Sequence, residues 1–292
     1  MDFDPVNRDA PAPRYELESG SEDEFDHDGV ATKIQGQLVL SATEAGSSST
    51  LQQGNPLVVL VRNAGAAFLS SLQGHRLEQR YSLRADSEQH ASIAVASSSS
   101  GSSITVAMVA PPPQLRSSRF HEIASTLLEA TKPSKVVIVD SYSQEQQLYR
   151  DTDSESDSEN EAAIKYLATP TFLAEEKVDS KRMEPLRSPE TASGLGAAFL
   201  SKAVINGVPA ILTLLEDVTF QSHVQLYGSL GASRLSPSAS KTLASLTGLD
   251  SIVASSAANS PSTGSTLSDF VASRRVKPAA NLAVLGDGNM YI

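Results

Sequence analysis

Two unbroken apolar runs predict β-strands in the interior of a sheet. Residues 57–61 read LVVLV and residues 136–139 read VVIV, so β-branched side chains dominate both runs. A strand with one solvent-facing side alternates apolar and polar residues, whereas a strand covered on both faces does not. Both segments are therefore expected to be strands that are buried on both faces.

Weaker patterns predict a hairpin, a helix and a loop. Apolar residues at 93–95 and 104–109 flank the serine-rich run 97–103, which is typical of two strands joined by an enlarged loop. Between 115 and 131, three apolar residues fall near helical spacing before Pro133 stops the helix: Ile123, Leu127 and Leu128. The polar, proline-containing stretch 177–189 is interpreted as loop.

The clearest helix–strand unit spans residues 193–215. Its apolar positions recur at spacings of three and four, at Leu195, Ala198, Phe199 and Ala203. Ser193 is expected to cap this helix and Gly207 to end it, since Pro209 prevents its continuation. The apolar strand AILTLL (210–215) follows at once. A helix that leads into a buried strand indicates the α/β class.

The glycines of this unit also suggest, at first, a phosphate-binding loop. Gly194-Leu195-Gly196 opens the helix, but the complete fingerprints GxGxxG and GxxxxGK[ST] are absent. A tight turn and close packing of the helix are favoured instead.

Charge is concentrated in two segments of the chain. The formal net charge is −11, yet residues 1–28 alone carry −8 and residues 151–161 carry −6, so the rest is weakly positive. Neither acidic segment has enough apolar residues to fold by itself. We expect a disordered acidic tail at 1–30, disordered inserts at 151–161 and 251–268, and one α/β domain over 31–285. The hydroxyl residues of 152–158 each have an acid three positions on, which suits acid-directed kinases.

Composition excludes several kinds of chemistry. The chain has no cysteine, which excludes disulfides, thiol nucleophiles and thiolate zinc sites. Its five histidines show no HxxxH or HExxH spacing, so no metal or other cofactor is expected. The sequence shows no secretory signal, no apolar stretch long enough to span a membrane and no basic patch for nucleic acid. We expect a soluble protein of the cytoplasm, and also of the nucleus, that binds neither membrane nor nucleic acid.

The final three residues form a hydrophobic–tyrosine–any motif. Met290, Tyr291 and Ile292 follow the glycine-flanked stretch 286–289, and we interpret 286–292 as a flexible docking tail. A terminal carboxylate can be captured by backbone donors or a lysine, while the tyrosine ring fills a pocket. The triplet resembles the HbYX tails that proteasome-binding proteins insert between neighbouring α subunits.

The helix–strand unit carries a second resemblance. Residues 194–200 (GLGAAFL) with 208–212 (VPAIL) resemble the proteasome assembly chaperones, and most closely the first subunit of the eukaryotic heterodimeric pair. This resemblance implies a three-layer, phosphorylase-like α/β sandwich without enzymatic activity. It also implies pairing with a second, related chaperone, and binding of both C-terminal tails to 20S α subunits while the α-ring assembles. The resemblance further implies that these tails, by occupying the pockets, delay the docking of regulatory particles there.

Two other functions are compatible with the sequence. The same fold could serve a nucleoside phosphorylase or a hydrolase, because fold does not fix function. Its candidate residues would be Asp140-Ser141, Glu216-Asp217 and His223, which follow or end predicted strands. The other alternative is a different proteasome regulator that uses the same type of tail.

Overall fold

The computed structural model describes residues 36–43, 51–72, 77–86, 88–97, 102–112, 115, 117–143, 164–188, 190–217, 235–250, 266, 267, 269 and 270. All of them belong to one compact unit that begins at Gly36. The expected disordered regions at 1–30 and 151–161, most of the one at 251–268, and the docking tail at 286–292 lie outside the described residues.

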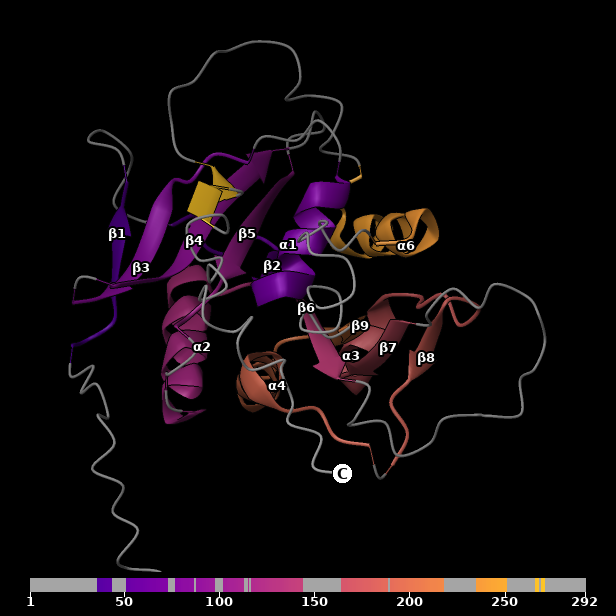
Figure 1. Cartoon of the computed structure of the whole chain (residues 1–292). Helices are drawn as coiled ribbons and strands as arrows, with labels where there is room; N and C mark the ends of the chain where they lie inside the picture. Colours follow the sequence, from indigo (N-terminus) through magenta and orange to yellow (C-terminus); the bar gives the residue numbers. More distant parts are fainter. Residues whose placement is uncertain are drawn as a thin grey trace, which may run out of the picture. The chain divides into compact units, whose positions relative to one another are not determined.

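The described strands form one mixed sheet of nine, in the order β1-β3-β4-β5-β2-β6-β9-β7-β8 (Figure 1). Their bounds are β1 Val39–Ala42, β2 Leu57–Val61, β3 Tyr81–Ala85, β4 Glu88–Ser97, β5 Ser103–Val109, β6 Val136–Ser143, β7 Ile164–Ala168, β8 Met183–Pro185 and β9 Ala210–Asp217. The four central strands β5, β2, β6 and β9 are parallel to one another. Antiparallel pairs extend the sheet on both sides, through β4, β3 and β1 and through β7.

The predicted interior strands are confirmed. β2 pairs with β5 on one side and with β6 on the other, and all five of its residues are buried. β6 pairs in turn with β9. The predicted hairpin is also confirmed, because β4 pairs antiparallel with β5 and its register ends at Ser97 opposite Ser103.

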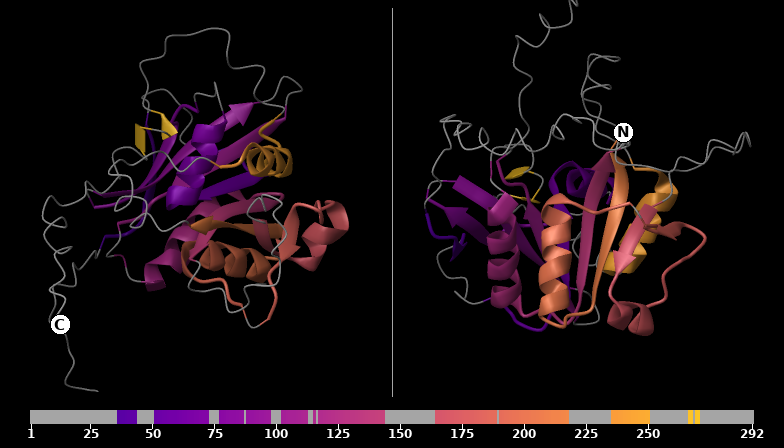
Figure 2. Two further views of the ribbon diagram at one scale, coloured as in Figure 1. Left: turned by 45° about the vertical axis from the view of Figure 1, so that its right-hand side comes forward. Right: turned by 90° about the horizontal axis from the view of Figure 1, so that it is seen from below.

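Helices cover both faces of the sheet, so the fold has three layers. Their bounds are α1 Arg62–Ser71, α2 Ser117–Thr131, α3 Pro170–Glu175, α4 Gly194–Ile205 and α6 Pro237–Thr247. Alternate residues of β2 and β6 pack with Phe68 of α1 and Leu243 of α6 in one core. On the opposite face α4 contacts β6 and β9 and packs against α2, as the right-hand view of Figure 2 shows. The predicted three-layer α/β class and the helix ending at Thr131 are confirmed.

Two local predictions were wrong. The stretch 177–189 contains a strand, β8, which pairs with β7 through Met183, Glu184 and Pro185. A three-residue strand leaves no periodic pattern, which is why this stretch resembles a loop. Leu267, placed in the disordered serine-rich segment, is 1% exposed and joins the core of α1 and α6.

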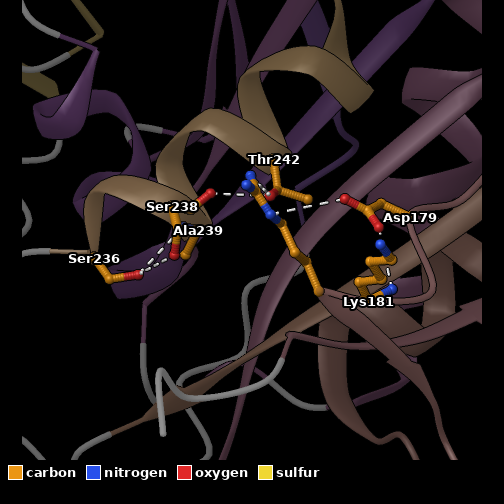
Figure 3. A network of polar contacts seen from close by, with 7 residues as sticks. Asp179, Lys181, Ser236, Ser238, Ala239 and Thr242 are labelled. Carbon is orange, nitrogen blue, oxygen red and sulfur yellow. Dashed lines mark hydrogen bonds and ion pairs between the residues drawn. The ribbon is translucent and has the colours of Figure 1, made fainter. Parts of the chain in front are cut away.

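Polar contacts attach α6 to the turn before β8 (Figure 3). Ser236 caps α6 by accepting a 3.2 Å hydrogen bond from the backbone N–H of Ala239. Thr242, the sixth residue of α6, accepts a 3.4 Å hydrogen bond from Nη1 of Arg182. Nε of Arg182 also lies 3.7 Å from Oδ2 of Asp179. The first of these contacts caps α6 and the other two link it to the turn, while the core shared with α1 places both helices on the same side of the sheet.

Candidate functional site

The carboxyl ends of β6 and β9 meet the N-terminus of α4, and Asp140 lies at this junction. Its Oδ2 accepts a 2.9 Å hydrogen bond from the backbone N–H of Gly196, and its Oδ1 accepts a 2.8 Å bond from that of Ser141. The residue is 8% exposed. A carboxylate at a helix N-terminus satisfies an orphan N–H and interacts favourably with the helix dipole. Asp140 therefore caps α4 from β6, a strand that is distant from the helix in sequence but in contact with it.

The predicted cap, Ser193, does not act through its side chain. It occupies the N-cap position with extended backbone but makes no side-chain hydrogen bond to the helix. Asp140 makes a capping bond to Gly196 N–H in its place. The prediction that Gly207 ends the helix is confirmed, since α4 ends at Ile205 and Gly207 has a φ of +67°.

Gly196 allows α4 to approach the sheet closely. A Cβ atom at this position would lie 2.5 Å from Oδ2 of Asp140 and 2.8 Å from Cδ1 of Leu212. Gly194 has a φ of +80°, a conformation that favours glycine. The predicted tight turn and close packing are thus confirmed. A phosphate-binding role is disfavoured, because the Asp140 carboxylate already occupies the N–H of Gly196 and would repel an anion there.

A buried ion pair lies beside the same edge of the sheet. Nζ of Lys165, the second residue of β7, hydrogen-bonds Oε1 of Glu190, and their side chains are only 11% and 6% exposed. The ammonium also lies 5.5 Å from the centroid of the Tyr142 ring at the end of β6. Oε2 of Glu190 accepts a 3.3 Å hydrogen bond from the backbone N–H of Arg187. The pair therefore attaches the connection before α4 to the sheet.

The charges around Glu190 determine its acidity. Burial alone raises the pKa of its carboxyl, but the Lys165 hydrogen bond, the Arg187 N–H and the positive charges of both residues outweigh burial. The pKa of Glu190 consequently lies below its usual range, and the carboxylate is ionised at neutral pH.

The enzyme alternative requires a cluster of polar side chains at the ends of β6 and β9. The two strand ends do lie together, since Tyr142 is opposite Glu216 and Ser143 is opposite Asp217. Asp140, however, uses both carboxylate oxygens for backbone N–H groups, which is a structural role. His223 lies outside the described residues. Within the part of the chain that the structure describes, no group of three or more His, Asp or Glu side chains is arranged to hold a metal ion.

Sequence reasoning missed the ion pair and could not place the tail. A lysine inside the apolar strand IKYLA (164–168) was the only local signal that a buried acid partner was required. The docking residues Met290, Tyr291 and Ile292 lie outside the described residues. None of the described helices combines the length and the apolar character that a membrane crossing requires.

Comparison with known proteins gives structural neighbours only. No family model matches the chain. No curated protein matches it by sequence either.

The structural neighbours include homologues of proteasome-assembly chaperones. Pyrococcus furiosus PbaA, an archaeal homologue of proteasome-assembly chaperone, has 14% identity and a TM-score of 0.47, covering 74% of this chain and 84% of its own. P. furiosus PbaB, an archaeal proteasome activator, has 13% identity and a TM-score of 0.47 over 74% and 89%. A Mycobacterium tuberculosis proteasome-assembly chaperone homologue has 13% identity and a TM-score of 0.36 over 78% and 98%. At these identities no individual residue can be carried across.

Proposed function

We propose that this chain is a proteasome assembly chaperone rather than an enzyme. It pairs with a second, related chaperone and binds α subunits of the 20S proteasome while their ring assembles, in the cytoplasm and the nucleus. Ile292 provides the terminal carboxylate, and the tail of Met290, Tyr291 and Ile292 inserts into a pocket between α subunits. While the tail occupies that pocket, a regulator with the same kind of tail cannot dock.

One contrast supports binding over catalysis. The titratable side chains described at the carboxyl edge hold the fold together: Asp140 caps α4, and Lys165 pairs with Glu190. The hydrophobic–tyrosine–any triplet at 290–292, by comparison, has the composition of a docking motif. The resemblance of GLGAAFL and VPAIL to assembly chaperones also supports a binding function. In this chain the second glycine of GLGAAFL is needed for packing, since Gly196 lies against Asp140 and Leu212.

The mechanism follows from tethering. One tail buries an aromatic ring and a carboxylate, which gives moderate affinity. Two tails on one heterodimer make the second insertion intramolecular, so affinity rises without a larger interface. The paired chaperones thus remain on a ring that presents two pockets at the correct spacing.

Binding of full-length and tail-altered protein to isolated α-rings tests the proposal. Deleting Met290, Tyr291 and Ile292 removes an aromatic hot spot of about 2 kcal/mol or more and the captured carboxylate, so affinity should fall roughly tenfold or more. Adding one alanine after Ile292 should have a similar effect, because it moves the carboxylate away from Tyr291.

A matched control has the same added length. Inserting one glycine between Gly288 and Asn289 leaves the triplet at the terminus and should leave binding unchanged. Wild-type affinity of both the truncated and the extended proteins would contradict the proposed function.

A peptidase assay on mature proteasomes separates this function from that of a regulator. An activator with the same tail raises peptide hydrolysis, whereas an assembly chaperone does not and is found on half-built particles. Purification of the tagged chain should yield a second chaperone and α subunits without the full set of β subunits. Turnover of nucleosides or esters by the purified chain would favour the enzyme alternative.

A further inference from the structure

Strand β1 forms one end of the sheet and has an open side. It pairs antiparallel with β3 and stands first in the strand order, as Figure 1 shows. In the part of the chain that the structure describes, no strand pairs with its other side. Val39, its first residue, is 55% exposed. The end strand of a sheet presents unpaired backbone N–H and C=O groups, on which another strand can form.

The register of β1 identifies the backbone groups that face this open side. The N–H of Thr43 donates a 2.8 Å hydrogen bond to the carbonyl of Arg80, in register with the pairing of β1 and β3. Hydrogen-bonded and non-hydrogen-bonded positions alternate along an antiparallel pair. Ser41 therefore directs its backbone groups toward β3, like Thr43. Leu40 and Ala42 direct theirs to the open side.

The two ends of the sheet differ in how far they can pair. At the far end, β8 has three residues and finishes with Pro185, which has no N–H to donate. Glu184 of β8 is charged and lies 2.7 Å from Arg187. Proline and charge are among the usual means by which proteins prevent pairing at a sheet edge. Residues 36–43, GQLVLSAT, contain neither, so the edge at β1 is the one that can accept a strand.

We propose that the open side of β1 binds β1 of a second copy of this chain, which joins two sheets into one. The strand is complementary to itself about a two-fold axis at Ser41. Leu40 and the partner's Ala42 then exchange two backbone hydrogen bonds, and Ala42 and the partner's Leu40 exchange two more. An axis at Leu40 would instead place Ala42 opposite Leu38, which lies outside β1.

Side chains and charge are compatible with this register. Opposite residues of antiparallel strands lie on the same face, so Leu40 shares a face with the fully buried Leu83. On that face Leu40 would lie beside the partner's Ala42, and on the other face Ser41 would lie beside the partner's Ser41. Residues 36–43 are uncharged, so no like charges meet. A charged peptide, by contrast, finds no opposite charge on this strand.

The expected dimer is weak and closed. Two four-residue strands bury less surface than a standard interface, so pairing should need high protein concentration. A two-fold contact uses the same edge of both copies, and β8 is protected, so association should stop at two chains. This inference is independent of the proposed function, and it does not assign the interface with the related chaperone.

Single introduced cysteines test the register, because the chain has none of its own. Ser41→Cys places two thiols at a non-hydrogen-bonded pair, whose Cα separation of about 4.5 Å suits a disulfide. Val39→Cys is the matched control. Val39 is the more exposed residue, yet its two copies would be offset by about 13 Å along the strands. Mild oxidation of the full-length proteins should therefore cross-link Ser41→Cys several-fold faster than Val39→Cys.

A proline at the open edge tests the pairing itself. The average mass of the wild-type chain in sedimentation equilibrium should rise from 30.8 kDa toward twice that value as its concentration is raised. Ala42→Pro removes an outward N–H and leaves the bonds to β3 in place, so this variant should stay at 30.8 kDa. Ala42→Ser keeps the N–H and should dimerise like the wild type.

Three results would overturn the proposal. The first is a wild-type mass that stays at 30.8 kDa at every concentration, and the second is equally fast cross-linking of the two cysteine variants. The third is an Ala42→Pro variant that still self-associates but no longer binds the related chaperone, since β1 would then serve that partner. If Ala42→Pro does not fold, the cysteine comparison still decides. None of these measurements involves α-rings, so the tail experiment remains a separate test.

Discussion

The backbone N–H of Gly196 and the carboxylate of Asp140 form a 2.9 Å hydrogen bond, although the two residues are 56 positions apart in sequence. This bond joins the first turn of α4 to Asp140, the fifth of the eight residues of β6. Both the cap of the helix and the distance of the helix from the sheet depend on it.

Replacing Asp140 with alanine should destabilise the protein by about 1–3 kcal/mol, because two backbone N–H groups lose their acceptor in a buried place. Urea unfolding followed by circular dichroism measures the change. Ser193→Ala is the matched control, since Ser193 makes no side-chain capping bond, and it should change stability by less than about 0.5 kcal/mol. Equal effects of the two substitutions would show that Asp140 is not the cap.

Gly196→Ala should destabilise the protein by about 1–3 kcal/mol through overpacking, since the added methyl would lie 2.8 Å from Leu212 and 2.5 Å from Asp140. Gly194→Ala has open space around its Cβ but a φ of +80°, and should cost about 1–2 kcal/mol through backbone strain alone. The two can be distinguished by adding Leu212→Val, which should partly relieve the first substitution and leave the second unchanged.

Lys165→Met should destabilise the protein by about 3 kcal/mol, because Glu190 would then be a buried carboxylate without its ammonium partner. Glu190→Gln should have an effect of the same sign. The double variant Lys165→Met/Glu190→Leu should cost clearly less than the sum, as measured in a double-mutant cycle by chemical unfolding. Additive effects would indicate that the two side chains do not interact.

Stability should fall in acid through Glu190. Its pKa is lower in the folded protein than the value of about 4.3 in an unfolded chain, so its contribution is fully present above pH 4.3. The contribution is lost as the pH falls through the lowered folded-state pKa. The difference in unfolding free energy between wild type and Glu190→Gln should therefore be constant from pH 7 to about 5 and shrink below about 4. A difference that is independent of pH down to 2 would contradict the pairing.

Addition of the related chaperone should raise the thermal midpoint of this chain, because a partner that binds only the folded state stabilises it by mass action. The shift should grow with partner concentration in differential scanning fluorimetry. The variant lacking Met290, Tyr291 and Ile292 should show the same shift, since pairing is proposed not to use the tail. An unchanged midpoint, with separate elution of the two proteins at micromolar concentration, would count against pairing.

The elements that sequence reasoning found are those whose burial has a local signature. β2 and β6 are covered on both faces and show unbroken apolar runs. By contrast, β7 carries Lys165, and nothing local shows that Glu190 neutralises it. α1 begins at Arg62 with a φ of +41° and no side-chain cap, so it lacks the usual start signal.

The contacts around the N-terminus of α4 join segments that are far apart in sequence, so no local pattern predicts them. Gly194 and Gly196 correctly indicated a turn and close packing, but the atoms that Gly196 approaches belong to β6 and β9. For the same reason the predicted N-cap position of Ser193 is correct, but its side chain does not make the capping bond. A serine before a helix is a local signal, whereas the carboxylate of Asp140 arrives through the sheet.

The strand order determines when this protein can fold during its synthesis. β2 lies between β5 and β6, yet it leaves the ribosome before both, and β6 is completed about 80 residues after β2. At roughly 5–20 residues per second, the apolar strand LVVLV waits on the order of 4–16 s before both of its neighbouring strands exist. An unpaired apolar strand pairs readily with other chains during such an interval. The nascent chain should therefore itself require general chaperones. Removing them should lower the yield of folded protein on expression, while the stability of the protein that does fold should change less.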